Sequence, residues 1–294
     1  MSRPGRVSDG SSSVGISTPG NDRSGKVSDG RVKDGKSTVG KLILRFIEPT
    51  EGRIMLGGTD IASLDPNTMR QYRRNAQMVF QDPYASLHPR QTVDQILREP
   101  LAIHGLDQRD QRIAQALAEV GLKPEHRFRY PHQLSGGQRQ RVAIAMAVLL
   151  SPKLVIADEP TTALDSRTQE DILDLLERMV REQGSALLLI SHDLAMVARR
   201  TDRVLIMQQG VVVESGPSAS VFRQGVHPYT RSLVAASACR PLRAPSAGAP
   251  ANSAPLLAVQ GVTCDYGGRR AVDGVSLAVM PGESVGLIGE SGAG

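Results

Sequence analysis

Two uninterrupted apolar segments, separated by one helical segment, constrain the fold of this chain more than any other feature. Residues 154–157 (LVIA) and 186–190 (ALLLI) have the length of strands, and residues 167–182 between them carry apolar side chains at helical spacing. Strands joined by a crossover helix run parallel, and a strand without polar residues is buried on both faces. The sequence therefore predicts an α/β fold with a mostly parallel sheet flanked by helices.

Further segments extend this alternation along the chain. Residues 93–121 have helical spacing throughout, and no strand-like run interrupts them. The other predicted helices cover residues 37–46 and 137–150, and the predicted strands and hairpins cover residues 53–56, 204–214, 257–262, 275–279 and 284–288.

Composition divides the chain into four parts. Residues 1–34 contain mainly Gly, Ser, Asp and Arg in near-repeats of GRVSDG, and so few apolar side chains predict disorder. Residues 35–239 hold the α/β core, with a helical insert at about 85–140. Residues 240–255 are rich in Ala, Pro and Ser, which is typical of a linker. Residues 256–294 then restart as β-rich sequence.

Charge and cysteine content exclude several classes of protein. The net charge of +5 contains no block of like charges, so it permits an anionic partner without implying one. Two cysteines, Cys239 and Cys264, form neither a four-ligand metal site nor a disulfide framework, which fits a reducing, cytosolic setting. The longest apolar run, 142–150, is about half of what a membrane-spanning helix needs. An aromatic content of 3% argues against base-stacking platforms for nucleic acid.

Two halves of phosphate-binding loops stand at opposite ends of the sequence. Residues 35–38 (GKST) run into an amphipathic helix, as in loops where backbone amides and a Lys contact phosphates and a Ser holds Mg²⁺. Near the C-terminus, a strand at 285–288 leads into GESGAG, whose glycines form the turn that precedes such a lysine. The chain therefore holds the second half of one loop and the first half of another.

Asp158 and Glu159 directly follow the apolar strand at 154–157. Such a strand delivers its acids to the carboxyl edge of a parallel sheet, where nucleotides bind. In that setting Asp158 supports Mg²⁺ and Glu159 polarises the attacking water. A solvated pair of strand-end acids is the alternative interpretation.

Residues 134–138 read LSGGQ, with two glycines where a helix is expected to begin. Amides at a helix N-terminus and a Ser hydroxyl form an anion site, although SGG alone is an ordinary turn and cap. The combination of LSGGQRQRVAIA at 134–145 with LVIADEPTTALD at 154–165 is far more specific. With these motifs the chain resembles the ATP-binding subunit of ABC transporters, and the resemblance covers residues 36–237 and 256–294.

The resemblance implies roles for further residues. Gln81 in VFQDPYASL is similar to the glutamine switch between core and helical insert, and His192 in ISHD is similar to the switch histidine at the γ-phosphate. With Glu159 they form the implied catalytic set, while Ser37, Gln81 and Asp158 are the implied magnesium ligands. The residues implied to bind ATP are Gly35, Lys36, Ser37, Thr38, Ser135, Gly136, Gly137, Gln138, Asp165 in the loop that crosses the ATPase dimer, the adenine-stacking Tyr266, Gly289, Gly292 and Gly294.

Three segments are similar to oligopeptide and dipeptide importer ATPases: 81–90 (QDPYASLHPR), 130–141 (YPHQLSGGQRQR) and 227–237 (HPYTRSLVAAS). The family implies a P-loop NTPase fold of ABC type, in which a small antiparallel β part accompanies the main sheet. It also implies ATP and Mg²⁺ as cofactors. The implied partners are a second ABC ATPase domain in a homo- or heterodimer, integral membrane permeases and a solute-binding protein, with no nucleic acid. The implied location is peripheral, on the cytoplasmic face of the cell membrane.

Two alternative functions stay open at this point. A soluble ABC ATPase acting on ribosomes or DNA is less favoured, because no coiled-coil insertion or basic nucleic-acid motif is present. A catalytically inactive fragment of a tandem protein, cut within both phosphate loops, is the other alternative, because neither loop is complete in linear sequence.

Residues 256–294 form the part that an ABC ATPase normally carries at its N-terminus. We expect residues 284–288 to fill the sheet parallel to 154–157, as in a circular permutation, with Gly294 near Lys36. The 16-residue linker at 240–255 spans up to about 50 Å when extended, which suffices to reach back. Alternatively, the segment belongs to a second domain and stays loose or pairs with another chain.

Overall fold

The computed structural model describes residues 35–162, 164–237, 254–266 and 269–289. The disorder expected for 1–34 and most of the linker expected at 240–255 lie outside these residues. Among the described helices, none combines the length and the apolar character needed to cross a membrane.

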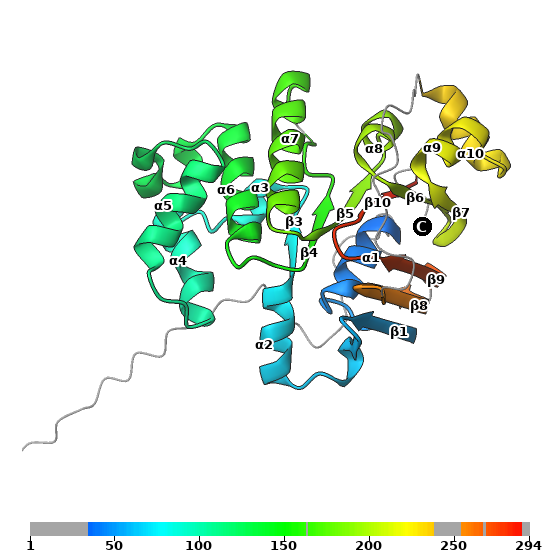
Figure 1. The fold of residues 1–294 in the computed structure, drawn as a ribbon, viewed down its shortest axis with the longest axis horizontal. Helices are drawn as coiled ribbons and strands as arrows, with labels where there is room; N and C mark the ends of the chain where they lie inside the picture. The colour runs from blue at the N-terminus through cyan, green and yellow to red at the C-terminus, as the bar shows by residue number, and fades with distance from the viewer. Residues whose placement is uncertain (1–34, 163, 238–253, 267–268, 290–294) are drawn as a thin grey trace, which may run out of the picture. The chain divides into compact units, whose positions relative to one another are not determined.

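The larger of two sheets contains six strands in the order β3-β4-β5-β10-β6-β7 (Figure 1). Its first five strands are parallel, and β7 pairs antiparallel with β6. The carboxyl ends of β3, β4, β5 and β10 consequently share one edge. The strands are β3 (Ala76–Val79), β4 (Leu154–Asp158), β5 (Ala186–Ser191), β6 (Arg203–Gln208), β7 (Val211–Pro217) and β10 (Ser284–Ile288).

Strand β10 comes from the C-terminal segment and lies in the interior of this sheet. Ser284 aligns with Leu187 of β5, and Val285 aligns with Arg203 of β6. The expected insertion of residues 284–288 into the sheet is therefore found. Its neighbours differ from a direct pairing with β4, because β5 lies between β4 and β10. The expected approach of Gly294 to Lys36 lies outside the described residues.

The second sheet is antiparallel and contains four strands in the order β2-β1-β8-β9. Here β1 pairs with β8, so the early part of the chain again pairs with the C-terminal segment. This sheet is the expected small antiparallel part. Its strands are β1 (Glu51–Leu56), β2 (Thr59–Asp60), β8 (Leu257–Tyr266) and β9 (Arg269–Val279).

Helix α1 (Gly35–Ile43) joins the two sheets, because its apolar face enters the core that side chains of both sheets form. A second core, on the other face of the six-stranded sheet, takes in the helical insert and the helices that follow it. The helices are α2 (Pro66–Asn75), α3 (Pro83–Ser86), α4 (Val93–Ile103), α5 (Arg109–Glu119), α6 (Gly136–Val148), α7 (Ser166–Glu182), α8 (Leu194–Arg200), α9 (Ser218–Gln224) and α10 (Pro228–Ala236), with short 3₁₀ turns η1 (Ile61–Ser63), η2 (Pro124–Phe128) and η3 (Pro131–Gln133).

Several boundaries differ from the sequence expectation. The helix expected at 37–46 begins two residues earlier and ends at Ile43, because Arg45 adopts a left-handed φ of 51° that stops the helical hydrogen bonding. The helical insert expected at 93–121 is found, and it consists of two helices, α4 and α5. Helix α2 and strand β3 have no counterpart in the expected elements.

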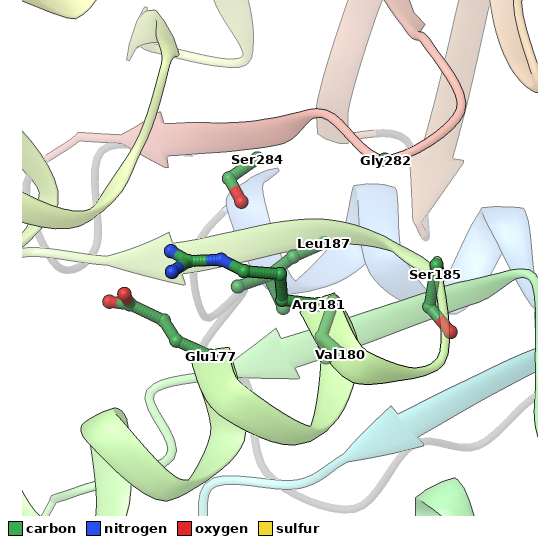
Figure 2. A pocket seen from close by; sticks show the side chains of 8 residues that line it. Glu177, Val180, Arg181, Ser185, Leu187, Gly282 and Ser284 are labelled. Carbon is green, nitrogen blue, oxygen red and sulfur yellow. The ribbon is translucent and has the colours of Figure 1, made fainter. Parts of the chain in front are cut away.

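The contact between core and C-terminal segment is visible at the amino ends of β5 and β10 (Figure 2). A pocket of about 180 Å³ lies there, lined on one side by the last turns of α7 and on the other by Gly282 and Ser284. Figure 2 shows Ser284 across from Arg181 of α7. The two parts therefore share this opening, at the sheet edge opposite the carboxyl ends.

Gly286 offers a direct test of how closely helix α8 packs on β10. A Cβ at this position would lie 2.2 Å from Cγ1 of Val197, so only glycine fits. Gly286→Ala is therefore expected to cost about 1–3 kcal/mol of the free energy of unfolding. Denaturant unfolding measures it. In the double variant with Val197→Ala the penalty should be smaller than the sum of the two single ones, and simple additivity would contradict the packing.

Candidate functional site

The described ends of the two separated loop halves, Lys36 and Gly289, meet at the carboxyl edge of the six-stranded sheet. Helix α1 begins at Gly35, and the Lys36 Nζ donates a hydrogen bond to the carbonyl oxygen of Gly289, one residue beyond β10. Lys36 is 3% exposed. A Cβ on residue 289 would lie 2.6 Å from the carbonyl oxygen of Met207, so glycine is required at this crossing. Gly292 and Gly294 lie outside the described residues.

The backbone N–H groups in the first turn of α1 have no carbonyl acceptor within the helix. Gly35, Lys36, Ser37 and Thr38 form this turn, and the helix dipole adds positive potential to the lysine charge. A Cβ at Gly35 would meet the carbonyl oxygen of Ala271 in β9 at 2.6 Å. The C-terminal segment therefore packs tightly against this turn, which has the character of an anion site.

Ser37 and Asp158 place two hard oxygen donors side by side. The Ser37 hydroxyl donates to Asp158 Oδ1 at 2.9 Å, and Asp158 is the last residue of β4 with 5% of its surface exposed. Burial is the main cause that raises the pKa of the Asp158 carboxyl, with the Glu159 charge adding to it and the Ser37 hydrogen bond opposing it. Hydroxyl and carboxylate oxygens are ligands that Mg²⁺ accepts. These residues therefore fit a magnesium ion.

Asp158→Asn is expected to raise the melting temperature of the nucleotide-free protein. A carboxyl with a raised folded pKa favours its protonated form, so wild-type stability falls as pH rises from the ordinary carboxyl pKa through the raised value. The amide carries no such penalty and still accepts from Ser37. Thermal unfolding between pH 4 and 8 should show a flatter profile for this variant. Asp107→Asn, at an exposed position, is the control; an equal change there would contradict the assignment.

Glu159 lies at the centre of a converging group of side chains. Its Oε2 accepts from Gln81 Nε2 at 3.0 Å and from Thr162 Oγ1 at 3.1 Å, and its Oε1 lies 2.8 Å from His192 Nδ1. The residue is 8% exposed. Its backbone φ is 45°, a value that residues other than glycine rarely adopt. Its amide donates to the carbonyl oxygen of Ile190 at 2.9 Å, which holds this turn on β5.

These contacts follow from the sheet order. Gln81 follows β3, Glu159 follows β4 and His192 follows β5, and these three strands are adjacent and parallel. Their carboxyl ends therefore deliver the three side chains to one place. The His192 side chain remains 57% exposed, so the carboxylate is buried beneath a group that faces solvent.

The LSGGQ segment forms a second feature at the start of α6. Ser135 is the N-cap, and a Cβ on Gly136 or Gly137 would lie 3.3 Å from Leu164 or 2.8 Å from Thr168, respectively. These glycines therefore allow the start of α6 to pack closely on the start of α7. Among the described residues, no hydrogen bond links this segment to Lys36 or Glu159.

Two further predicted residues have clear structural positions. Asp165 caps α7, where its side chain accepts from the Thr168 amide at 3.0 Å, and the Thr168 hydroxyl is the main cause that lowers the pKa of this carboxyl. Tyr266 ends β8, where its backbone pairs with Arg269.

Sequence reasoning missed two residues that contact this machinery. Thr162 donates to Glu159, and its place three residues after the acid in DEPTT is the signal that indicates a one-turn contact. His126 lies 3.2 Å from Gln138, twelve positions along the chain, and no short-range pattern marks that contact.

Comparisons with known proteins agree with this geometry. The family described as ABC transporter matches residues 30–162. The chain is 51% identical over 203 residues to the glutathione import ATP-binding protein GsiA of Salmonella paratyphi A and 48% identical to GsiA of Escherichia coli K12, each match covering 68% of this chain. The chain spans 33% of the length of these relatives.

Solved structures support the same assignment. A dimeric post-hydrolysis structure of the ATP-binding cassette MJ0796 with ADP and Pi matches with a TM-score of 0.56 and 34% identity, covering 63% of this chain and 81% of that one. The cbiO1 protein of Clostridium perfringens, part of the cbiONQ ABC transporter complex, matches with a TM-score of 0.58 and 29% identity, covering 66% and 80%. The motifs, the sheet topology and these matches together identify the chain as an ABC transporter ATP-binding domain.

Proposed function

We propose that this chain binds and hydrolyses ATP with Mg²⁺ and thereby powers the uptake of a peptide-type solute through a membrane permease. The arrangement around Glu159 carries the proposal, because Gln81 and His192 from the two neighbouring strand ends, and Thr162 from its own turn, converge on this buried carboxylate. A carboxylate fixed in this way beside a phosphate site is suited to accept a proton from an attacking water. The split loop and the Ser37–Asp158 pair supply that phosphate site.

Residues at different positions of the site have different proposed roles. The first turn of α1 and Lys36 bind and orient the phosphates, and Ser37, Asp158 and Gln81 would hold a Mg²⁺ ion, which would supply charge neutralisation at the phosphate oxygens. Glu159 accepts the proton of the water, while Gln81, Thr162 and His192 fix the direction of its two oxygens. Hydrolysis then proceeds by positioning and charge stabilisation rather than by covalent catalysis.

The separate contacts of the two features of the site are consistent with a second ATPase domain. The LSGGQ segment has no hydrogen bond to Lys36 or Glu159 in the described part of the chain, so we assign it to the nucleotide held by a partner domain. The dimeric MJ0796 structure and the cbiONQ complex are precedents among the similar proteins for a paired ATPase and a transporter assembly. The proposed partners are therefore a homologous or identical ATPase domain, membrane permeases and a solute-binding protein at the cytoplasmic membrane.

The solute class rests on the relatives. GsiA is named for glutathione import, and the segments at 81–90, 130–141 and 227–237 resemble peptide importers. Reconstitution with candidate permeases in vesicles, followed by ATP-dependent uptake of labelled glutathione and dipeptides, tests this assignment. ATP hydrolysis without stimulation by any permease would contradict the transport function while leaving the ATPase assignment intact.

Lys36→Ala is expected to weaken ATP binding about tenfold to hundredfold. The lysine contributes a charge-assisted contact to phosphate, and such contacts are worth about 1.5–3 kcal/mol. The shift in melting temperature produced by ATP and Mg²⁺ reports the change. Lys153→Ala, an exposed lysine at the opposite end of β4, is the matched control and should retain the full shift.

A wild-type chain that binds ATP without turnover would instead support the inactive-fragment alternative. The assay for this is steady-state phosphate release by the purified chain, with and without the Glu159→Gln substitution. A turnover that exceeds that of the variant establishes the active function.

A further inference from the structure

The start of helix α6 is closed by a reciprocal pair of hydrogen bonds. The Ser135 Oγ accepts from the Gln138 amide at 3.3 Å, and the Gln138 Oε1 accepts from the Ser135 amide at 3.0 Å. This capping box satisfies two of the orphan donors at the helix start. Because the carboxamide oxygen of Gln138 is engaged with Ser135, its NH₂ group faces the other way.

The Gln138 NH₂ group faces the ring of His126, which belongs to η2. The Gln138 Nε2 lies 3.2 Å from His126 Nε2, and His126 is 7% exposed. An NH₂ group only donates, so the ring nitrogen has to accept and carries no proton. The proton of the neutral ring then sits on Nδ1, which lies 3.1 Å from the carbonyl oxygen of Lys123.

This tautomer keeps three of the four contacts of the network and loses the fourth, in which the Lys123 amide donates to Nδ1 at 3.0 Å. A ring that kept the Lys123 contact would carry its proton on Nε2 and would keep only two. That proton would point at the Gln138 NH₂ group, so two donors would face each other. Rotating the Gln138 amide would relieve this conflict only by turning its NH₂ group toward the Ser135 amide, which is also a donor.

We propose that His126 is a positioning residue for the LSGGQ segment: in its neutral Nδ1–H form it holds the Gln138 amide so that the capping box stays closed. The inference rests on the proposed function in one respect, namely that this helix start contacts the nucleotide of a partner domain. A closed capping box fixes the entry angle of residues 135–137, and with it the direction of the free amides that would meet a phosphate. His126 itself does not contact the nucleotide.

Two substitutions separate positioning from bulk packing. His126→Leu fills a similar volume but offers no acceptor, whereas His126→Gln places an amide oxygen at about the reach of Nε2 and restores one. His104→Leu is the matched control, a half-buried histidine at the end of α4 in the same helical insert. Circular dichroism and melting temperatures establish that all variants fold.

The first readout does not depend on ATP hydrolysis. Amide exchange followed by NMR should show the Ser135 amide exchanging about threefold to tenfold faster in His126→Leu, with protection regained in His126→Gln, since one hydrogen bond is worth about that factor. The ring ¹⁵N shifts of His126 should show an unprotonated Nε2. Unchanged Ser135 protection in His126→Leu, or a protonated Nε2 in the neutral ring, would overturn the proposal.

The second readout is the ATPase activity of the full chain. His126→Leu should raise the KM for ATP about threefold to tenfold with a smaller change in kcat, His126→Gln should recover most of that loss, and His104→Leu should match the wild type. Equal kinetic losses in the two His126 variants would overturn the positioning role. If the wild type lacks turnover while the exchange results hold, the proposed ATPase function fails and the His126 contact stands.

Discussion

Glu159→Gln is expected to lower ATP turnover by about 10² to 10⁴ while leaving ATP binding nearly unchanged, because general base catalysis contributes factors of this size. The glutamine has almost the shape of the glutamate, and its oxygen can still accept from Gln81 and Thr162, which share Oε2. Its nitrogen would then face His192 Nδ1, which a neutral ring can offer as an acceptor. The fold and the metal ligands are retained, and only the proton acceptor is lost.

Single-turnover phosphate release and ATP-dependent thermal shifts measure the two halves of this expectation separately. Glu182→Gln, an exposed carboxylate at the end of α7, is the control and should leave both unchanged. Retained turnover in Glu159→Gln would remove this carboxylate from catalysis. A lost thermal shift would mean that the residue is needed for binding as well.

The parallel sheet was predictable because its strands are uniformly apolar. Because residues 154–157 and 186–190 are entirely apolar, they predict strands that are buried on both faces of the sheet. Glu159 and His192 come after these strands in the chain, so they lie at the carboxyl edge of the sheet. What the pattern does not contain is the lateral order of strands. The parallel strands have similar apolar sequences. The sequence therefore predicts that β10 runs parallel to β4, but it does not predict that β5 lies between them.

The missed elements are those whose apolar signal is weak. Helix α2 buries only Met69 and Tyr72 among polar and charged residues, and β3 is four residues long with a glutamine inside it. The capping signal was present at Asp65, whose side chain accepts from two amides at the start of α2 beside a proline. Local chemistry therefore marked the start of this helix, although hydrophobic spacing did not.

The sequence identifies the motifs of the site, but only part of its contacts. A short string fixes the neighbours of each motif residue along the chain, and the two loop halves predict that the C-terminal end approaches Lys36. They do not specify the hydrogen bond from Lys36 to Gly289. The contact of Thr162 is local, and its place three residues after Glu159 is a signal that the motif analysis did not use. The contact of His126 with Gln138 depends on how turns fold back in space, which no periodicity of the sequence encodes.

Removal of residues 254–294 is expected to abolish cooperative folding of the remaining core. Strand β10 pairs with β5 on one side and β6 on the other, so its loss would leave backbone donors and acceptors unpaired inside the sheet. Antiparallel strand β1 would lose its partner β8 as well. Within the described part of this segment, twelve apolar side chains are buried: Leu257, Val259, Val262, Cys264, Ala271, Val272, Val275, Leu277, Val279, Val285, Leu287 and Ile288.

The size of this loss exceeds what a domain of ordinary stability tolerates. Full burial of a Val, Leu or Ile side chain is worth about 1.5–3 kcal/mol, so the Val, Leu and Ile side chains in this set together match or exceed a total stability of about 5–15 kcal/mol. Thermal unfolding followed by circular dichroism should show no cooperative transition for residues 1–253 alone. Co-expression of residues 254–294 as a separate chain should restore it, because the contacts require the strands and not the covalent connection. A truncated chain that melts cooperatively near the wild-type temperature would show that the core closes without β10, and would favour assigning the C-terminal segment to another domain.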